Sequence, residues 1–208
     1  ETTMRTRRAG LFMLAGILAC LSAPAAQKDL RDGDHRPDKV MDIAGLTAGM
    51  TVGEVGAGEG YFTFKLAARV GPSGRVYAND IDARALGRLA DRARREGFSN
   101  IETIVGEVDD PLLPPALDAV FMVNVFHDLA EPVALLRSLV PCLKPDAAVI
   151  ILDRDPARFG AGSRHNLPTE TILALIKEAG FELVRTETAF RVHNLYLNKP
   201  KLLPEMER

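Results

Sequence analysis

The sequence of 208 residues has no tryptophan and only two cysteines, Cys20 and Cys142. Two cysteines are too few for a metal cluster or for a framework of disulfides. Basic residues are not in excess, because 26 Lys and Arg stand against 28 Asp and Glu, a net charge of −2. This balance does not suggest a nucleic-acid-binding surface. The sequence also has no low-complexity region and no internal repeat.

Hydrophobic residues make up 47% of the sequence and charged residues 26%. This composition is ordinary for a globular protein, and the length is sufficient to bury one substantial core. We therefore expect a single domain over residues 27–208, preceded by a separate N-terminal segment.

Residues 1–26 have the order of a secretory signal peptide: a short basic start, an apolar run at 9–21 and small residues at 22–26. The run is shorter than the ~20 residues of a membrane span, and Pro24 would break its extension. Cleavage is therefore favoured over a membrane anchor, with lipidation at Cys20 left open. We expect an exported, periplasmic or envelope-associated protein that contacts a membrane only through an uncleaved or lipidated N-terminus; without a signal it would be cytoplasmic.

Short apolar segments alternate with longer amphipathic ones from residue 37 onward. The pattern predicts strands at 50–55, 75–79, 101–105, 118–123, 147–152, 181–186 and 190–197. It predicts helices at 37–46, 60–70, 83–96, 131–142 and 169–179. Strands that alternate with helices form a parallel sheet covered on both faces. We therefore predict an α/β fold with a doubly wound, mostly parallel seven-stranded sheet, in which a C-terminal hairpin adds one antiparallel strand at an edge.

The stretch VGEVGAGEGYFT at 52–63 is a glycine-rich turn with two acidic residues. A dinucleotide-binding turn has a third glycine and holds a pyrophosphate at the start of a helix. Here Tyr61 stands at the third-glycine position, and Glu54 and Glu59 would repel a pyrophosphate. The turn instead suits a positively charged ligand that needs close backbone approach. A plain tight turn is the alternative, but it rarely needs four glycines.

Acidic residues also follow the next two predicted strands. Asp80 lies about 20 residues beyond the glycines, where a carboxylate can accept both hydroxyls of a ribose. A helix cap is the alternative there, although Asp82 is placed for that role. Glu107 could accept from the amine of a base, whereas Asp109 and Asp110 are interpreted as a solvated turn. Ligands of parallel sheets bind beyond the carboxyl ends of the strands, so we expect a negative rim that suits a cationic nucleoside.

With these residues the sequence resembles class I S-adenosylmethionine-dependent methyltransferases over residues 37–198. The resemblance rests on the motifs at 54–60, 80, 106–108, 124–128 and 143–146. Within that superfamily the sequence is most similar to small single-domain enzymes of the ubiquinone/menaquinone-methyltransferase type. The resemblance implies a Rossmann-like methyltransferase fold, S-adenosyl-L-methionine as cofactor, no metal, and methyl transfer to a small-molecule acceptor.

The resemblance also implies roles for individual residues. Glu54 would hold the ammonium group of the cofactor, and the glycines of the turn would let the backbone approach its methionine part. Asp80 would bind the ribose, Ile81 would lie against the adenine, and Glu107 would accept from the adenine amine. Asn124 would line the floor near the methyl group. The implied cofactor-binding residues are Glu54, Gly56, Ala57, Gly58, Tyr61, Asp80, Ile81, Glu107, Val108 and Asn124.

Methyl transfer from a sulfonium mainly requires alignment of the reacting atoms and exclusion of water. A general base is needed only for some acceptors. His127 and Asp128, just past the fourth predicted strand, are the candidates for catalysis together with Asn124, and a packing role for His127 is equally open. His35 and Arg36 precede the first helix and are candidates for a lid.

Residues 153–155 and His165 are candidates for the acceptor side, and nothing in the spacing of their acids argues for a metal site. A nicotinamide-dependent oxidoreductase would need a glycine at position 61 and an uncharged turn. The alternative from a different class is a non-catalytic S-adenosylmethionine- or nucleoside-binding protein of the cell envelope. An exported enzyme would have no obvious supply of the cofactor, which keeps this alternative open.

Overall fold

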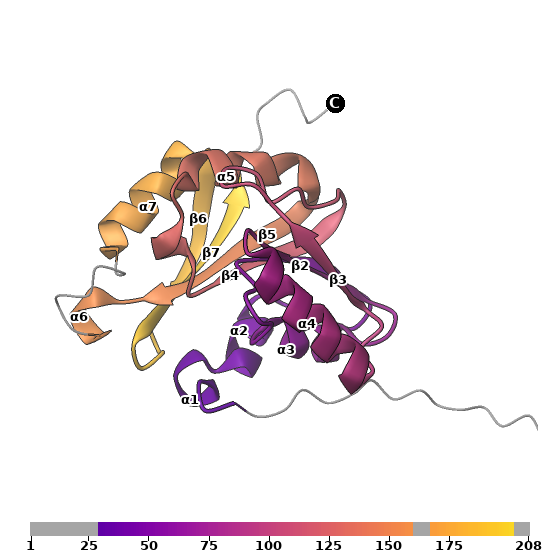
Figure 1. Cartoon of the computed structure of the whole chain (residues 1–208). Helices are drawn as coiled ribbons and strands as arrows, with labels where there is room; N and C mark the ends of the chain where they lie inside the picture. Colours follow the sequence, from indigo (N-terminus) through magenta and orange to yellow (C-terminus); the bar gives the residue numbers. More distant parts are fainter. Residues whose placement is uncertain (1–28, 160–166, 202–208) are drawn as a thin grey trace, which may run out of the picture.

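The structure is a computed structural model that describes residues 29–159 and 167–201. These residues form one seven-stranded sheet with helices on both faces (Figure 1). The predicted α/β class and the mostly parallel sheet are thereby confirmed. The predicted signal peptide, Cys20 and His165 lie outside the described residues, and what we infer from them stays a prediction. Within the described ranges, no helix has the length and apolar character needed to cross a bilayer.

The sheet has the strand order β3-β2-β1-β4-β5-β7-β6. Its strands are β1 (Thr51–Val55), β2 (Arg75–Asp80), β3 (Ile101–Val105), β4 (Leu117–Val123), β5 (Leu143–Arg154), β6 (Phe181–Glu187) and β7 (His193–Pro200). Strands β1 to β5 pair in parallel, and β7 pairs antiparallel with both β5 and β6. The predicted C-terminal hairpin with one antiparallel strand is confirmed, but the predicted place of that strand at the edge was wrong, because β7 lies inside the sheet and β6 forms the edge. The burial pattern explains this order, since most of β7 is buried and most of β6 is exposed.

All five predicted helices are present, in part with different ends. The helices are α1 (Asp32–His35), α2 (Pro37–Ile43), α3 (Thr63–Val70), α4 (Ala83–Glu96), α5 (Pro132–Leu139), α6 (Pro156–Phe159) and α7 (Thr169–Glu178), with short 3-10 turns η1 (Phe126–Asp128) and η2 (Val140–Cys142). Helix α3 begins later than predicted because Gly60 still belongs to the turn, with φ 89°. Helices α1 and α6 have four residues each, too few to show a helical period in the sequence.

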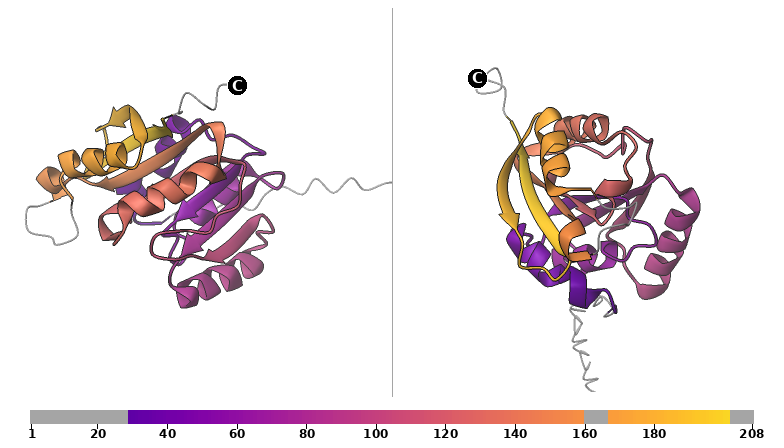
Figure 2. Two further views of the ribbon diagram at one scale, coloured as in Figure 1. Left: turned by 90° about the horizontal axis from the view of Figure 1, so that it is seen from above. Right: turned by 90° about the vertical axis from the view of Figure 1, so that its left-hand side faces the viewer.

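Helices cover both faces of the sheet (Figure 2). One buried cluster packs the sheet against α2, α3 and α4, and a second packs it against α5 and α7. Residues 119–122 of β4 are all buried, as expected for a parallel strand between two helical layers. The parallel register brings the carboxyl ends of β1, β2 and β4 to one rim of the sheet, where Glu54 lies beside Ala78 and Phe121.

Asn100 closes the C-terminal end of α3, the helix that follows the glycine-rich turn. Its buried amide donates hydrogen bonds to the carbonyl oxygens of Ala67 (2.9 Å) and Gly71 (2.8 Å). We expect Asn100→Ala to lower the free energy of unfolding by about 1–3 kcal/mol, because helix-end carbonyls lose their partner. Urea denaturation measures this loss, with the exposed neighbour Ser99→Ala as control. Equal effects of the two substitutions would contradict the capping role.

Candidate functional site

A hollow of about 620 Å³ lies at the rim where β1 and β4 end. It is lined by the ends of these strands, by the turn that follows β1, and by α4 and the segment around α1. Six of the predicted cofactor-binding residues line it, namely Glu54, Gly56, Ala57, Gly58, Tyr61 and Asn124. The other four are not part of this lining: Asp80 is the last residue of β2, and Ile81, Glu107 and Val108 lie on the loops after β2 and β3.

The turn after β1 needs glycine for two separate reasons. Gly56 and Gly58 have φ of 73° and 54°, in the left-handed region that L side chains rarely adopt. At Gly56 a Cβ atom would lie 2.3 Å from Cγ2 of Val125, so a side chain has no room. At Gly58 a Cβ atom would meet nothing within 4 Å, which leaves space for a ligand to approach the backbone. The predicted close approach therefore fits the geometry at Gly58.

Glu54 carries its carboxyl group inside the protein, at the end of the central strand. The residue is 2% exposed, and its Oε2 accepts a hydrogen bond of 2.5 Å from Oγ1 of Thr63. Burial raises the pKa of Glu54 to about 8, and the charge of Asp80 adds to this rise, while the bond from Thr63 opposes it. A cation bound beside Glu54 would offset this effect and favour the carboxylate.

Asp80 is held in place by two backbone groups. Its Oδ2 accepts from the N–H of Gly58 at 2.8 Å and its Oδ1 from the N–H of Asp82 at 2.9 Å. Each carboxylate oxygen has room for a further donor, so two ribose hydroxyls can still be bound. The cap of α4 is formed by Asp82, whose Oδ1 accepts from the N–H groups of Arg84 and Ala85. The alternative of Asp80 as the helix cap is therefore wrong.

The loops after β2 and β3 lie side by side because the N–H of Gly106 donates to the carbonyl oxygen of Asp80 at 3.1 Å. Two apolar side chains on these loops are left uncovered, with Ile81 64% and Val108 47% exposed. Glu107 is exposed next to Val108. These groups suit a flat heterocycle with an amino group, because the two exposed apolar side chains can contact its ring and the carboxylate can accept a hydrogen bond from its amino group.

Asn124 follows β4 with its backbone in the left-handed region, at φ 59°. Its N–H donates to the carbonyl oxygen of Leu152 at 2.7 Å. Its side-chain oxygen Oδ1 is buried and has no hydrogen-bond partner among the described residues. A buried acceptor without a donor is costly, so this oxygen is suited to a donor on a ligand in the hollow.

His127 and Asp128 lie in η1, and neither lines the hollow. Asp153, at 1% side-chain exposure, accepts from the backbone N–H of His127 at 3.0 Å and contacts its Nδ1 at 2.6 Å. Nε2 of His127 lies 3.3 Å from Oδ2 of Asp128. Burial lowers the pKa of His127, but the bond to Asp153 and the nearby carboxylates outweigh it and raise the pKa above its usual value. The pair fastens η1 to the end of β5, which favours the packing role, and a catalytic role stays a prediction.

Apart from His35, a lid candidate of the sequence analysis, the far wall of the hollow consists of residues that the sequence analysis did not single out. It is formed by Arg31 before α1, by His35 at its end, and by Arg88, Asp91, Arg92 and Arg95 of α4. The guanidinium of Arg31 lies 3.8 Å from the centre of the Tyr61 ring, and Glu59 pairs with Arg88 at 2.8 Å. In the sequence, arginines at such helical spacing are typical of a solvated face.

Within the described ranges, no group of three or more His, Cys, Asp or Glu side chains could hold a metal ion.

Comparison with known proteins adds an independent finding. The profile of a family described as a methyltransferase domain matches residues 46–205. The ubiquinone/menaquinone biosynthesis C-methyltransferase UbiE of Idiomarina loihiensis is 28% identical over 125 residues, 58% of this chain and 50% of that protein. The protein of the same name from Escherichia fergusonii is 25% identical over 188 residues, 73% of this chain and 75% of that protein.

A solved structure resembles the fold over most of its length. A SAM-dependent methyltransferase from Aquifex aeolicus is 27% identical and superposes with a TM-score of 0.77, covering 82% of this chain and 93% of that one. In contrast, the chain spans only about half the length of the Idiomarina relative.

The two glycines of the turn allow a matched test of the local geometry. We expect Gly56→Ala to lower the free energy of unfolding by clearly more than Gly58→Ala. Both substitutions force an alanine into the left-handed region, at a cost of about 1–2 kcal/mol, but only the first also collides with Val125. Chemical denaturation of both variants gives the comparison. Equal losses would show that the packing of Val125 against Gly56 is not as described.

The buried carboxyl group of Glu54 predicts a pH dependence of stability. Its pKa is raised in the folded protein from 4.5 to about 8, so the folded state binds more protons than the unfolded state between these values. This contribution to stability is present in full below pH 4.5 and is lost as the pH rises toward 8. We expect the difference in unfolding free energy between wild type and Glu54→Gln to change across this window. A difference that does not vary with pH would mean that Glu54 is ionised throughout.

Proposed function

Because the chain belongs to the methyltransferase domain family, we propose that it transfers a methyl group from S-adenosylmethionine to a small-molecule acceptor. At the level of the family, the resemblance, the enzyme class and the cofactor predicted from the sequence are confirmed. The comparisons give no support to the alternative of a non-catalytic binding protein. The acceptor and the residues that bind each group are our proposal.

The observation that carries the proposal is the pairing of a buried carboxyl group with an open glycine turn at the same rim. S-adenosylmethionine, when bound, supplies a methyl group on a positively charged sulfur. Glu54 would hold its ammonium group, because a cation bound beside this buried carboxyl group favours its ionised form. Asn124 would accept a further hydrogen bond through its unpartnered Oδ1.

The nucleoside part would lie on the neighbouring loops. Asp80 keeps free acceptor capacity on both oxygens, and Gly58 holds it in place. Ile81 and Val108 would cover an adenine ring, with Glu107 at its amino group. These residues fix the cofactor by its two ends, so that the methyl group points in a defined direction. Alignment of this kind is the main requirement of an in-line methyl transfer.

The acceptor would enter the part of the hollow that the cofactor leaves open. A volume of about 620 Å³ is in the range of small-molecule sites, which supports a small acceptor. The two curated relatives are named for ubiquinone and menaquinone biosynthesis. A quinone-type ring is therefore a suitable first acceptor to test, although this chain spans only half of the Idiomarina protein.

Two measurements test the function. Isothermal titration with S-adenosylmethionine and S-adenosylhomocysteine is expected to show binding of both. Incubation with a radiolabelled methyl donor and a cell extract is then expected to transfer label to a small molecule. Binding without transfer to any acceptor would support the non-catalytic alternative, and absence of binding would reject the cofactor site.

Asp80→Ala is expected to weaken S-adenosylmethionine binding by about 10- to 100-fold, since hydrogen bonds to a charged group are lost. Asp82→Ala is the matched control, because Asp82 also lies at this rim but caps α4. We expect the control to lower stability and to leave affinity nearly unchanged. Calorimetric titration of both variants measures the contrast. Unchanged affinity of the Asp80 variant would reject the ribose assignment.

A further inference from the structure

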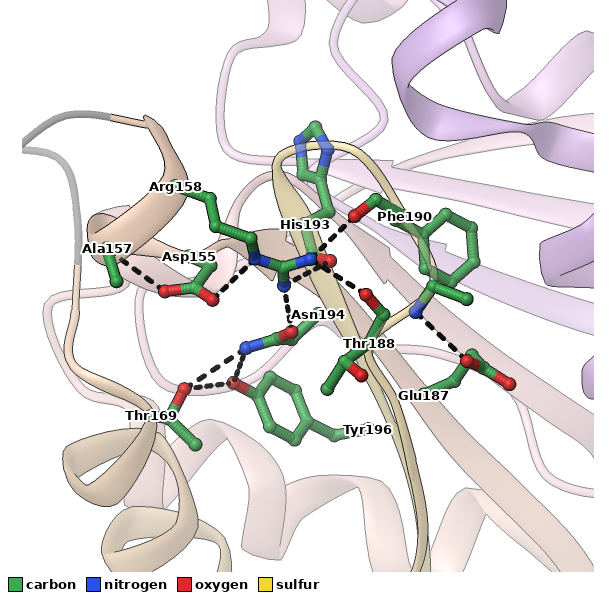
Figure 3. A network of polar contacts seen from close by, with 11 residues as sticks. Asp155, Ala157, Arg158, Thr169, Glu187, Thr188, Phe190, His193, Asn194 and Tyr196 are labelled. Atoms are coloured by element: carbon green, nitrogen blue, oxygen red, sulfur yellow. Dashed lines mark hydrogen bonds and ion pairs between the residues drawn. The ribbon is translucent and has the colours of Figure 1, made fainter.

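A single arginine in α6 organises the turn between β6 and β7. Arg158 extends its guanidinium into this turn, residues 188–192, from the segment that follows β5 (Figure 3). Its NH1 and NH2 groups donate to three backbone carbonyl oxygens and one side-chain oxygen, and its Nε to a carboxylate. The acceptors are Thr188 (2.8 Å), Phe190 (2.6 Å), His193 (2.9 Å), the side chain of Asn194, and Asp155 (2.7 Å).

This arrangement depends on the shape of the guanidinium group. Arginine presents five donors in a fixed plane, whereas the ammonium group of lysine has three donors around one point. Asn194 is held in turn by Thr169 and Tyr196, which fasten the network to α7 and β7. One guanidinium thus joins carbonyl groups at both ends of the turn, two of them in part-buried hydrogen bonds, so Arg158 fixes the conformation of the turn.

The same turn contacts helix α1 from the other side. Arg191 forms a two-fold ion pair with Asp34, at 2.6 Å and 3.0 Å. The rings of His35 and His193 are both buried and pack against each other, with centroids 4.5 Å apart and the ring planes tilted by 38°. Burial and then the neighbouring His35 lower the pKa of His193 to about 4, so its ring is neutral near pH 7 and packs as an uncharged group. The guanidinium of Arg36 donates to the carbonyl oxygen of Ala189 at 3.3 Å.

Helix α1 cannot hold its position alone, because a helix of four residues is not stable by itself. On one side Asp32 binds Lys65 at 2.8 Å and Tyr61 at 3.1 Å. On the other side of α1, Asp34 contacts Arg191 and His35 contacts His193. Since Arg31 and His35 line the hollow, the position of α1 decides how that wall closes.

We propose that the β6–β7 turn latches α1 over the cofactor hollow, and that Arg158 is a positioning residue that sets this latch. The latch slows the departure of S-adenosylmethionine without touching it. This inference rests on the proposed function, since it requires that the hollow binds this cofactor. With this proposal, residues 35 and 36, the lid candidates of the sequence analysis, become part of the latch.

A charge exchange tests the latch. Asp34→Arg and Arg191→Asp each place like charges together at an exposed pair and are expected to speed dissociation of S-adenosylmethionine about two- to fivefold. The double variant restores an opposite pair and is expected to return the rate toward wild type. Stopped-flow displacement by S-adenosylhomocysteine measures the rates.

The matched control is the exposed pair Arg75–Glu102, which lies at the amino-terminal ends of β2 and β3, away from the rim with the hollow. Reversing it by Arg75→Glu and Glu102→Arg is expected to leave dissociation unchanged. Failure of the wild type to bind the cofactor would reject the proposed function. Binding by the wild type with equal dissociation rates in all variants would reject the latch alone.

Arg158→Lys tests the positioning role with the charge retained. We expect dissociation to become about tenfold faster, because one ammonium group cannot serve the same acceptors. In the ligand-free protein, hydrogen exchange at the amides of Asp34, His35 and Arg36 is expected to become faster, while that of the central strand β1 is unchanged. Faster exchange in the turn with wild-type protection of α1 would overturn the proposal.

Discussion

Glu54 ends the central strand with its carboxyl group out of water, held by one hydroxyl group, that of Thr63. Strands pair with β1 on both sides, so this group cannot turn to solvent without disturbing the sheet. The burial of a carboxyl group is unfavourable unless something compensates the ionised form. Three further features lie near this position. A ligand can approach the backbone at Gly58, and Asp80 provides a second carboxylate. The side-chain oxygen of Asn124 has no hydrogen-bond partner among the described residues. Together they favour a ligand that is cationic on one side and rich in donors.

The sequence predicts the sheet well because its determinants are local. Alternation of apolar strands and amphipathic helices, with Gly97 and Asp82 at the ends of α4, is legible without knowledge of contacts. The same holds for the glycine turn and for the acids at strand ends, which share a rim by topology alone. The position of β7 inside the sheet is not legible, because an isolated hairpin has no marker for which of its strands pairs with β5. Burial decides it, and burial is a property of the assembled sheet.

The far wall of the site is predicted poorly for a related reason. The sequence shows His35 only as a residue before a helix, and its ring contact with His193 joins parts of the chain that are distant in sequence. Arg158 had no motif, since its acceptors are mostly backbone carbonyls, which every residue carries. Asp153 likewise gained a partner in His127 only through the pairing of β4 with β5. Residues that act through backbone groups or long-range contacts leave little trace in a single sequence.

The place of β7 between β5 and β6 also has a consequence for biosynthesis. Because β6 pairs with no other strand than β7 among the described residues, residues 181–187 emerge from the ribosome before the strand that anchors them exists. In the nascent domain, strands β1 to β5 can pair early, but the part of the sheet beyond β5 cannot form until residues 193–200 have been translated. Until then the outer side of β5 is a bare edge, which is open to pairing with another chain. Among the described residues, the last strand to be synthesised is thus the one that covers the open edge of β5.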